Sequence, residues 1–409
     1  MNFGVRNFFA GFSITPVIGN GRPCDLYECG EVVPVTLELK GKKEETDQIT
    51  LLIDDNEGKV TERSFSATEP ITFVVERSCP GFVNFQLQWH HKDGSVTKLE
   101  RSVGFSVEEI KAEPEPEDFY SFWKELFDEA SALPEPPQMT PLVTDFTSEK
   151  NDLYELAVPT LNGKTVYGYL SIPKAPGKYP IMVGYPGTGS AAGIRPSFIY
   201  PDAISLFMEV HTYRPIPHES REETIARAGW YNPFSYAVQG IESRESFFYH
   251  DILPGIHRAL DFIEKLPQYD GRNIGFFGSS QGGWLSTMMA AFHPEVSAMF
   301  LNVPAFTQWN GFNSVRVNVA QHSDDPEYEK RARETLRYYS SVHAARYTDA
   351  TVAMTVGRID PICPPASVYA LYNRFPGKKV IYHEMDMRHE CRDSWTEGVK
   401  ALHDHLTGQ

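Results

Sequence analysis

The sequence predicts an all-β domain followed by a larger α/β domain with a doubly wound, mostly parallel sheet. The chain has 409 residues, which is more than one ordinary domain accommodates. Short runs of alternating apolar residues fill the first part, whereas strand-like and helix-like segments alternate in the second. A run of alternating Pro and Glu separates the two parts. We therefore expect a β domain over residues 1–110, a linker over 111–117 and an α/β domain over 118–409.

Four segments of the first domain have the composition of strands. Val33–Leu39 alternates between apolar and polar positions, and Ile49–Ile53 and Ile71–Val75 are rich in β-branched residues. In Val83–Trp89 the apolar side chains recur at every second residue, as in a strand with one buried face. Several short strands separated by turns predict a small sandwich of the immunoglobulin type. The Cys–Trp–Cys pattern of antibody domains is absent, so the prediction concerns the architecture alone.

The linker Lys111–Glu117 alternates Pro with Glu, a composition that favours an extended chain and cannot form a core. Asp118, which follows it, is a candidate N-cap of a helix. Apolar side chains, most of them aromatic, then recur with helical spacing, which predicts a packing face, and Pro134–Pro137 ends the helix. These side chains are Phe119, Phe122, Trp123, Leu126, Phe127 and Ala130.

The α/β domain begins with a predicted hairpin. Tyr154–Val158 and Val166–Ile172 flank a turn that contains Asn162–Gly163. Strands and helices alternate from the apolar run Tyr179–Tyr185 onward, which predicts a mostly parallel sheet. The further strands expected are Ile204–Val210, Ile274–Phe277, Met299–Val303, Thr351–Val356 and Val380–His383. The further helices expected are Phe247–Leu266 with a kink at Pro254, Trp284–Phe292, Asp325–His343 and a last helix that carries Trp395, Val399, Leu402 and Leu406.

Gly278–Gly282 lies between a predicted strand and a predicted helix and reads Gly-Ser-Ser-Gln-Gly. It fits the G-x-S-x-G pattern, which holds a nucleophilic serine on a sharp strand-to-helix turn. The small residues let the strand and the helix approach, and the turn aims the backbone N–H after the serine at a developing oxyanion. The pattern predicts Ser280 as a nucleophile. The alternative is a Gly- and Ser-rich turn with no catalytic role.

The acid and the base of a serine hydrolase are expected on later loops. A serine hydroxyl becomes nucleophilic when an imidazole takes its proton and a carboxylate orients that imidazole. In this type of sheet the chain order is Ser, acid, His, with each residue on a loop after a strand. Asp360 and His389 lie just after the last two predicted strands. We therefore predict Asp360 as the acid and His389 as the base, with Asp386 and His383 as the competing candidates.

An oxyanion hole needs two backbone N–H donors, one after the nucleophile and one from the loop after an earlier strand. Gln281 follows Ser280, and Tyr185 ends the apolar strand that precedes a Pro-Gly turn. We expect the backbone N–H groups of these two residues to form the hole, and an ordinary β–α turn at Tyr185 is the alternative. The acyl pocket is expected beside Ser280, with a lining of Pro186, Pro304, Phe306 and Ile362.

Composition narrows the classes of partner. The net charge of −16 argues against nucleic acid and against an anionic membrane surface. No run of 18 apolar residues is present, so we expect no membrane-spanning helix. Met1–Gly19 lacks the pattern of a signal peptide, so we expect a cytoplasmic protein, or an exported one if a leader was removed.

The cysteines indicate free thiols and no zinc site. The chain has five of them, a sparse and odd set for its length. Cys24 and Cys29 are near enough in sequence to pair in an exported protein. No group of cysteines and histidines has the spacing of a zinc site, so we expect no metal.

Several of these segments are similar to a known family, the acetylxylan esterase and cephalosporin C deacetylase group. This group is carbohydrate esterase family seven, within the α/β-hydrolase superfamily. The resemblance extends roughly from Asp118 to the C-terminus. The similar segments are Gly278–Gly283, Gly357–Pro365 and His389–Glu390, with support from Glu334–Tyr339 and Arg258–Phe262.

The resemblance implies an α/β-hydrolase fold and a serine esterase that removes acetyl groups from acetylated sugars and small acetyl esters. It assigns the catalytic triad to Ser280, Asp360 and His389, and the oxyanion hole to the backbone of Tyr185 and Gln281. It implies neither a metal nor another cofactor. The family resemblance also leads us to expect a homo-oligomer.

Two other functions agree with parts of the sequence. A peptidase of the prolyl-oligopeptidase type also has a G-x-S-x-G-G elbow, but a first domain of about 110 residues is too small for the propeller of that class. A non-catalytic carbohydrate-binding protein could use the β domain as its binding module. Such a protein would not need all three triad residues, so we favour the esterase.

Overall fold

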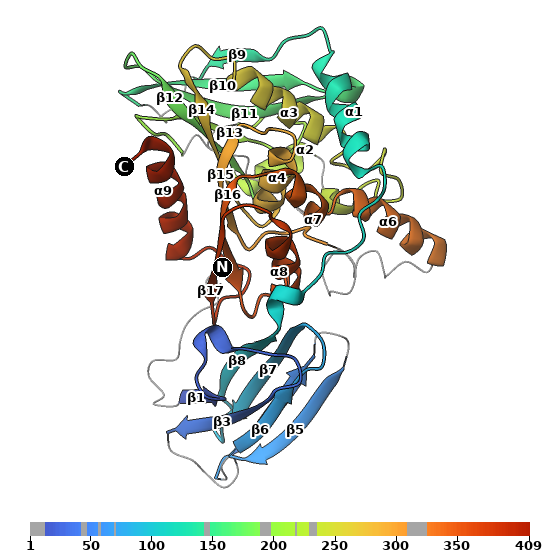
Figure 1. Cartoon of the computed structure of the whole chain (residues 1–409), viewed down its shortest axis with the longest axis vertical. Helices are drawn as coiled ribbons and strands as arrows, with labels where there is room; N and C mark the ends of the chain where they lie inside the picture. The colour runs from blue at the N-terminus through green and yellow to red at the C-terminus, as the bar shows by residue number, and fades with distance from the viewer. Residues whose placement is uncertain are drawn as a thin grey trace.

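The computed structural model describes residues 13–41, 47–55, 59–68, 71–142, 148–188, 198–216, 219–228, 235–308 and 325–409. Most of Met1–Gly19, where a signal peptide would lie, is outside these residues. Strands β1 to β8 form one part of the molecule, and a large sheet with its helices forms the other (Figure 1). Within the described residues, no helix combines the length and the apolar character that crossing a membrane requires.

Two sheets form the first part of the chain, and their buried side chains share one apolar core. Alternate residues of β3 and β7 are buried, as the sequence pattern predicts. One sheet has the order β1 (Ser13–Ile18), β3 (Val32–Lys40) and β6 (Ile71–Glu76). The other has the order β2 (Leu26–Tyr27), β8 (Val96–Phe105), β7 (Gly81–His90), β4 (Gln48–Asp54) and β5 (Val60–Ser66).

A nine-stranded sheet organises the second part. Its strands run parallel from β17 to β13, and the remaining three pair antiparallel, so the predicted mostly parallel sheet is confirmed. The order is β17 (Lys379–Glu384), β16 (Thr351–Gly357), β15 (Val296–Asn302), β14 (Tyr269–Ser279), β12 (Tyr179–Tyr185), β13 (Ile204–Met208), β11 (Thr165–Pro173), β10 (Asn151–Pro159) and β9 (Gln138–Pro141).

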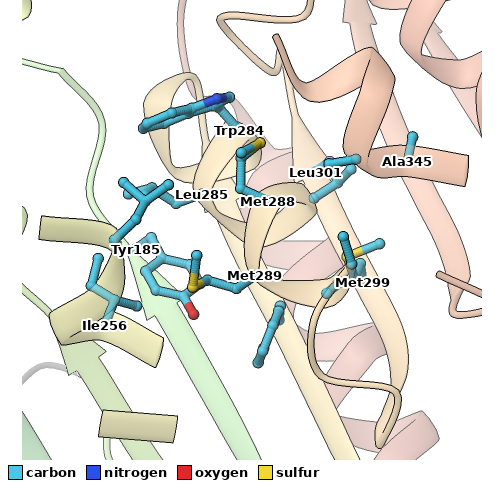
Figure 2. Close-up of a cluster of buried hydrophobic side chains, with 14 of the residues drawn as sticks. Tyr185, Ile256, Trp284, Leu285, Met288, Met289, Met299, Leu301 and Ala345 are labelled. Atoms are coloured by element: carbon cyan, nitrogen blue, oxygen red, sulfur yellow. The ribbon is translucent and has the colours of Figure 1, made fainter. Parts of the chain in front are cut away.

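Helices cover both faces of this sheet. Phe276 of β14 belongs to the core shared with α3 and α4, whereas the next residue, Phe277, belongs to the core shared with α9. Side chains of α4 pack against Tyr185 of β12 and against β15 (Figure 2). The α-helices are α1 (Phe119–Ser131), α2 (Arg221–Ala228), α3 (Ile252–Ile263), α4 (Gln281–Ala290), α6 (Pro326–Tyr338), α7 (Ser341–Ala344), α8 (Pro365–Arg374) and α9 (Asp393–Thr407).

One local prediction was confirmed in position only, and another was wrong. Asp118 is the N-cap residue of α1, as expected, but its carboxylate makes no side-chain capping bond and instead accepts hydrogen bonds from Tyr338 and Arg244 (2.5 and 2.8 Å). The helix expected from Phe247 begins only at Ile252, so Pro254 lies in the first turn of α3. The N–H groups of a first turn have no carbonyl partner within the helix, so a proline there causes no kink.

Candidate active site

Ser280 stands at the junction of β14 and α4 with φ 57° and ψ −117°, a conformation that residues other than glycine rarely adopt. Backbone hydrogen bonds hold it there. The Ser280 N–H donates to the Asn302 carbonyl (2.9 Å). The Ser280 carbonyl accepts from the N–H groups of Gly283, Trp284 and Ala305 (3.0, 3.2 and 2.9 Å). The side chain is therefore presented on a backbone that is fixed on both sides.

Two glycines of the pattern are required by close backbone contacts. A Cβ atom on Gly278 would lie 2.2 Å from the carbonyl carbon of Gly282. A Cβ atom on Gly282 would lie 2.3 Å from the carbonyl oxygen of Tyr185, at the end of β12. Neither position accommodates a side chain without backbone movement, because the strand, the helix and the neighbouring loop meet here. This is the physical reason for the G-x-S-x-G pattern in this chain.

The structure brings together the three side chains that the sequence singled out, and we call Ser280, His389 and Asp360 the triad below. His389 Nε2 lies 2.9 Å from Ser280 Oγ, and His389 Nδ1 lies 2.8 Å from Asp360 Oδ2. The other carboxylate oxygen of Asp360 accepts hydrogen bonds from the N–H groups of Ile362 and Cys363 (2.8 and 2.9 Å). A hydroxyl, an imidazole and a buried carboxylate in this order can activate the hydroxyl as a nucleophile.

The competing acid and base are engaged elsewhere. Asp386 pairs with Arg392 (2.7 Å), and this guanidinium lowers the pKa of the Asp386 carboxyl. His383 Nδ1 accepts from the guanidinium of Arg358 (3.2 Å), and its Nε2 shares a hydrogen bond with the Tyr369 hydroxyl (2.9 Å). Burial, with a smaller contribution from the charge of Arg358, lowers the pKa of His383 to about 4. A histidine that resists protonation in this way is poorly suited to act as a proton shuttle.

Gln281 connects the nucleophile turn to the loop after β12. Its side chain is fully buried, and its Oε1 accepts hydrogen bonds from the hydroxyls of Tyr249 and Tyr236 (2.5 and 3.1 Å). Its Nε2 donates to the carbonyl of Pro186 (3.3 Å). Its backbone N–H is the first of α4 and has no carbonyl partner within the helix. The side chain thus fixes the position of a backbone donor that lies next to Ser280.

Tyr185 has its ring in the core and not beside Ser280. The ring packs edge to face on Phe276, with centroids 5.7 Å apart, and it lies among the core side chains of α4 (Figure 2). Burial raises the pKa of the Tyr185 hydroxyl well above its ordinary value. Only the backbone of Tyr185 lies at the nucleophile turn, where its carbonyl approaches Gly282.

The residues predicted to line the acyl pocket lie beside the triad in the chain or in space. Pro304 and Phe306 flank Ala305, whose N–H is bonded to the Ser280 carbonyl. Pro304 is buried, and the half-buried Phe306 packs on Trp284 with ring centroids 4.9 Å apart. Pro186 is held by Gln281, as described above, and Ile362 follows Asp360 with 38% of its surface exposed. That these side chains contact an acyl group stays a prediction.

Asn302 is a site residue that the sequence analysis missed. It is fully buried at the end of β15. Its amide nitrogen donates to Ser279 Oγ (2.8 Å) and to the carbonyl of Glu390 (3.3 Å), and its amide oxygen accepts from the Thr355 hydroxyl. One side chain therefore connects the segments that carry the nucleophile, the acid and the base. The sequence did contain a signal for this residue, namely an amide side chain at the end of an apolar strand.

One group of possible metal ligands lies outside the triad among the described residues. It consists of His257, Asp261 and His293. His257 Nδ1 lies 2.8 Å from His293 Nε2, whereas the other ring nitrogen, Nε2, lies 3.7 Å from Asp261. His293 Nδ1 in turn lies 3.1 Å from Glu264. One ligand atom from each of the three residues lies within 4.8 Å of the others, and the contacts that the two histidines make here form a hydrogen-bond chain that ends at Glu264.

Comparisons with known proteins cover most of the chain. A sequence model of the family described as acetyl xylan esterase (AXE1) matches residues 106–404. The acetyl esterase Axe7A of Xylanibacter ruminicola is 31% identical over 307 residues, which are 73% of this chain and 69% of that protein.

Two solved structures have a similar fold. Acetyl xylan esterase 1 from Thermoanaerobacterium sp. JW/SL YS485 has a TM-score of 0.58 at 20% identity and covers 74% of this chain and 96% of its own. The acetyl xylan esterase from Paenibacillus sp. R4 has a TM-score of 0.58 at 21% identity, and the match covers 73% of this chain and 98% of that one. At these identities the likeness shows the fold alone. The predicted α/β-hydrolase fold with a mostly parallel sheet is confirmed.

Proposed function

Because this chain belongs to the acetyl xylan esterase family, we propose that it is a serine esterase that removes acetyl groups from acetylated carbohydrates and small acetyl esters. The observation that carries the proposal is the position of His389, hydrogen-bonded to Ser280 Oγ on one side (2.9 Å) and to Asp360 on the other (2.8 Å). This arrangement allows one imidazole to take a proton from the hydroxyl while a carboxylate holds the tautomer that makes the transfer possible.

In the first half of the reaction, Ser280 Oγ attacks the carbonyl carbon of the acetyl group, and His389 Nε2 takes the hydroxyl proton. The negative charge that develops on the carbonyl oxygen is stabilised by the backbone N–H groups of Tyr185 and Gln281. The bond from the carbonyl carbon to the sugar oxygen then breaks. His389 returns its proton to that oxygen, the sugar alcohol leaves, and an acetyl group remains on Ser280.

In the second half, a water molecule donates a proton to His389 Nε2 and attacks the acetyl carbonyl carbon. The bond to Ser280 Oγ breaks, acetic acid is released as acetate at neutral pH, and Ser280 regains its proton from His389. Asp360 stays ionised throughout and stabilises the imidazolium that forms in each half. The N–H groups of Ile362 and Cys363 donate to its other oxygen and so hold the carboxylate in place beside His389.

The domain division is part of the proposal. We divide the chain into an immunoglobulin-like β sandwich over residues 1–110, a linker over 111–117 and a catalytic domain over 118–409. A separate apolar core in the first part supports this division. The linker carboxylate of Glu115 pairs with Arg346 and Arg374 (3.2 and 3.4 Å), which supports a linker that lies along the catalytic domain.

The test compares substrates and variants. The purified protein should release acetate from acetylated xylo-oligosaccharides and from a chromogenic acetyl ester, and it should leave a chromogenic dipeptidyl amide intact. Ser280→Ala should lower kcat by about 10³-fold or more with unchanged folding. Ser279→Ala is the matched control, because its hydroxyl bonds to Asn302 and Cys391 and not to His389. Equal losses at the two serines, or faster cleavage of the amide, would contradict the proposal.

A further inference from the structure

The loops that carry Asp360 and His389 are both held by one strand of the β domain. This strand is β8, which lies at the end of the β domain that faces β17 and α8 (Figure 1). It carries Glu100 and Ser102, which are two residues apart and therefore point to the same face of the strand. Each of them binds an arginine that lies one or two residues before a triad residue in the chain.

The acid loop is held through Arg358, two residues before Asp360. The Arg358 side chain is fully buried, and its Nε and Nη2 donate to the hydroxyl and the carbonyl of Ser102 (3.0 and 2.8 Å). Its Nη1 donates to the carbonyl of Cys24 (2.5 Å), and its guanidinium stacks on Phe82 at 5.0 Å. A buried charge is costly unless its donors are satisfied, so these contacts fix the acid loop to the β domain.

The histidine loop is held through Arg388, the residue before His389. The Arg388 guanidinium forms an ion pair with the carboxylate of Glu100. Arg388 is 52% exposed and Glu100 is 25% exposed, so this pair contributes little to the free energy of unfolding. It joins the histidine loop to strand β8 at the residue before His389.

The two loops also pack directly on each other. The Ile359 N–H donates to the carbonyl of Met387 (3.2 Å). A Cβ atom on Gly357 would lie 2.9 Å from the carbonyl oxygens of both Met387 and Arg388. A displacement of one loop relative to the other therefore changes the distance between Asp360 and His389 directly.

We propose that strand β8 is a positioning element of the active site. Ser102, acting through Arg358, and Glu100, acting through Arg388, together set the separation and orientation of Asp360 and His389. The proposal rests on the proposed function, since it concerns the same triad. It gives the β domain a role in the chemical step that is separate from substrate binding.

A charge-swap experiment on the full chain tests this role. Glu100→Arg and Arg388→Glu each break the ion pair, and each should lower kcat for a chromogenic acetyl ester by about tenfold, with KM within about twofold. The double variant restores the pair with reversed polarity and should recover most of kcat. The matched control is Glu31→Gln, which breaks the ion pair of Arg22 and Glu31 (2.7 Å) within the β domain. It should leave kcat unchanged.

The buried contact is tested with Arg358→Lys and Ser102→Ala. A lysine keeps the charge but lacks the planar guanidinium whose three nitrogens reach the oxygens of Ser102 and Cys24, so kcat should fall more than KM changes. Unchanged kcat in both Glu100→Arg and Arg388→Glu, or a loss that the double variant does not recover, would overturn the positioning role. Full activity of Ser280→Ala would instead overturn the proposed function, so the two failures are distinguishable. If Arg358→Lys does not fold, the variants of Glu100 and Arg388 still test the positioning role.

Discussion

The two oxygens of the Asp360 carboxylate accept hydrogen bonds from different partners. One oxygen accepts from His389, and the other accepts from two backbone N–H groups. An amide in its place would have to direct its NH₂ group either at those N–H groups or at the imidazole. The first orientation sets donors against donors, and the second favours the wrong tautomer of His389.

We therefore expect Asp360→Asn to lower kcat by about 10³- to 10⁴-fold, in line with the loss when such an acid is replaced. Steady-state kinetics with one acetyl ester measures this loss. Asp386→Asn is the control, because Asp386 pairs with Arg392 and not with the imidazole. The assignment of the acid is wrong if Asp386→Asn is the more damaging change.

His389→Ala should cost nearly as much in kcat as Ser280→Ala, because His389 is the base that is hydrogen-bonded to the Ser280 hydroxyl in the part of the chain that the structure describes. The double variant should be scarcely slower than either single variant, since the residues act as a unit. The measurement is the residual kcat of the three variants with the same ester. Multiplicative losses would show that the two side chains act independently and would contradict a shared proton transfer.

At the scale of single residues, the sequence predicted the site residues that a local pattern in the chain marks. Ser280, Asp360 and His389 each follow a strand that the apolar pattern reveals. The sequence did not predict that the Tyr185 ring turns into the core or that Asn302 links three segments. Both depend on which strands become neighbours, and no local pattern encodes that.

The turn between β14 and α4 depends on a close approach of three elements. Gly282→Ala places a Cβ atom 2.3 Å from the backbone oxygen of Tyr185, so the loop after β12 must move. Because that loop supplies the proposed oxyanion donor, we expect kcat to fall at least tenfold. This corresponds to a rise of about 1.4 kcal/mol in the activation free energy.

Gly187→Ala is the control for this change in the same loop. Among the described residues, its Cβ atom would meet only the carbonyl oxygen of Ser279, at 3.6 Å, which is an ordinary contact. Thermal unfolding of both variants separates a local movement from loss of the fold. Similar kcat values for Gly282→Ala and Gly187→Ala would contradict the requirement for glycine at 282.

The turn after β15 should limit the length of the acyl group. It brings Pro304 and Phe306 next to Ser280, and Phe306 is already packed on Trp284. A longer acyl chain must displace such side chains, and overpacking costs about 1–3 kcal/mol. We expect kcat/KM to fall at least tenfold from acetyl to butyryl esters of one alcohol, because tenfold needs only about 1.4 kcal/mol.

Phe306→Ala should relax this selectivity by raising the rate with the butyryl ester relative to the acetyl ester. The measurement is kcat/KM for acetyl, butyryl and octanoyl esters of one chromogenic alcohol. A rate that holds or rises with chain length in the unmodified protein would contradict a closed acyl pocket.

The turn after β15 also contains two residues in the left-handed conformation, Val303 and Phe306 (φ 38° and 48°), which the sequence pattern did not predict.

At the scale of the whole molecule, the sequence predicted two folding units but not how they meet. Strand β8 was not predicted, because Val96–Phe105 carries charged residues where an apolar alternation is expected. The linker was predicted to be extended, and its ion pairs were not predicted. Arg358 and Ser102 are 256 residues apart, and contacts at such separations have no local signature.

Buried histidines at these junctions should make stability depend on pH. Burial first, and then the charge of Arg358, lowers the pKa of His383 to about 4. Burial is also the main reason that the pKa of His343, which lies 3.7 Å from the linker carboxylate of Glu113, is lowered to about 3. In the unfolded chain a histidine titrates near 6.5. Between these values the unfolded chain binds more protons than the folded one, so acid favours unfolding.

We therefore expect the midpoint temperature of unfolding to be steady above about pH 6.5 and to fall as the pH is lowered from there towards 4. His383→Gln cannot titrate and keeps an oxygen that can accept from Arg358, so its midpoint should fall less over this range. His405→Gln changes an exposed histidine of α9 and is the matched control, with the full pH dependence retained. Calorimetric scans at a series of pH values measure the midpoints. Identical slopes for the two variants would show that the contact of His383 with Arg358, where the β domain meets the acid loop, does not contribute to the pH dependence.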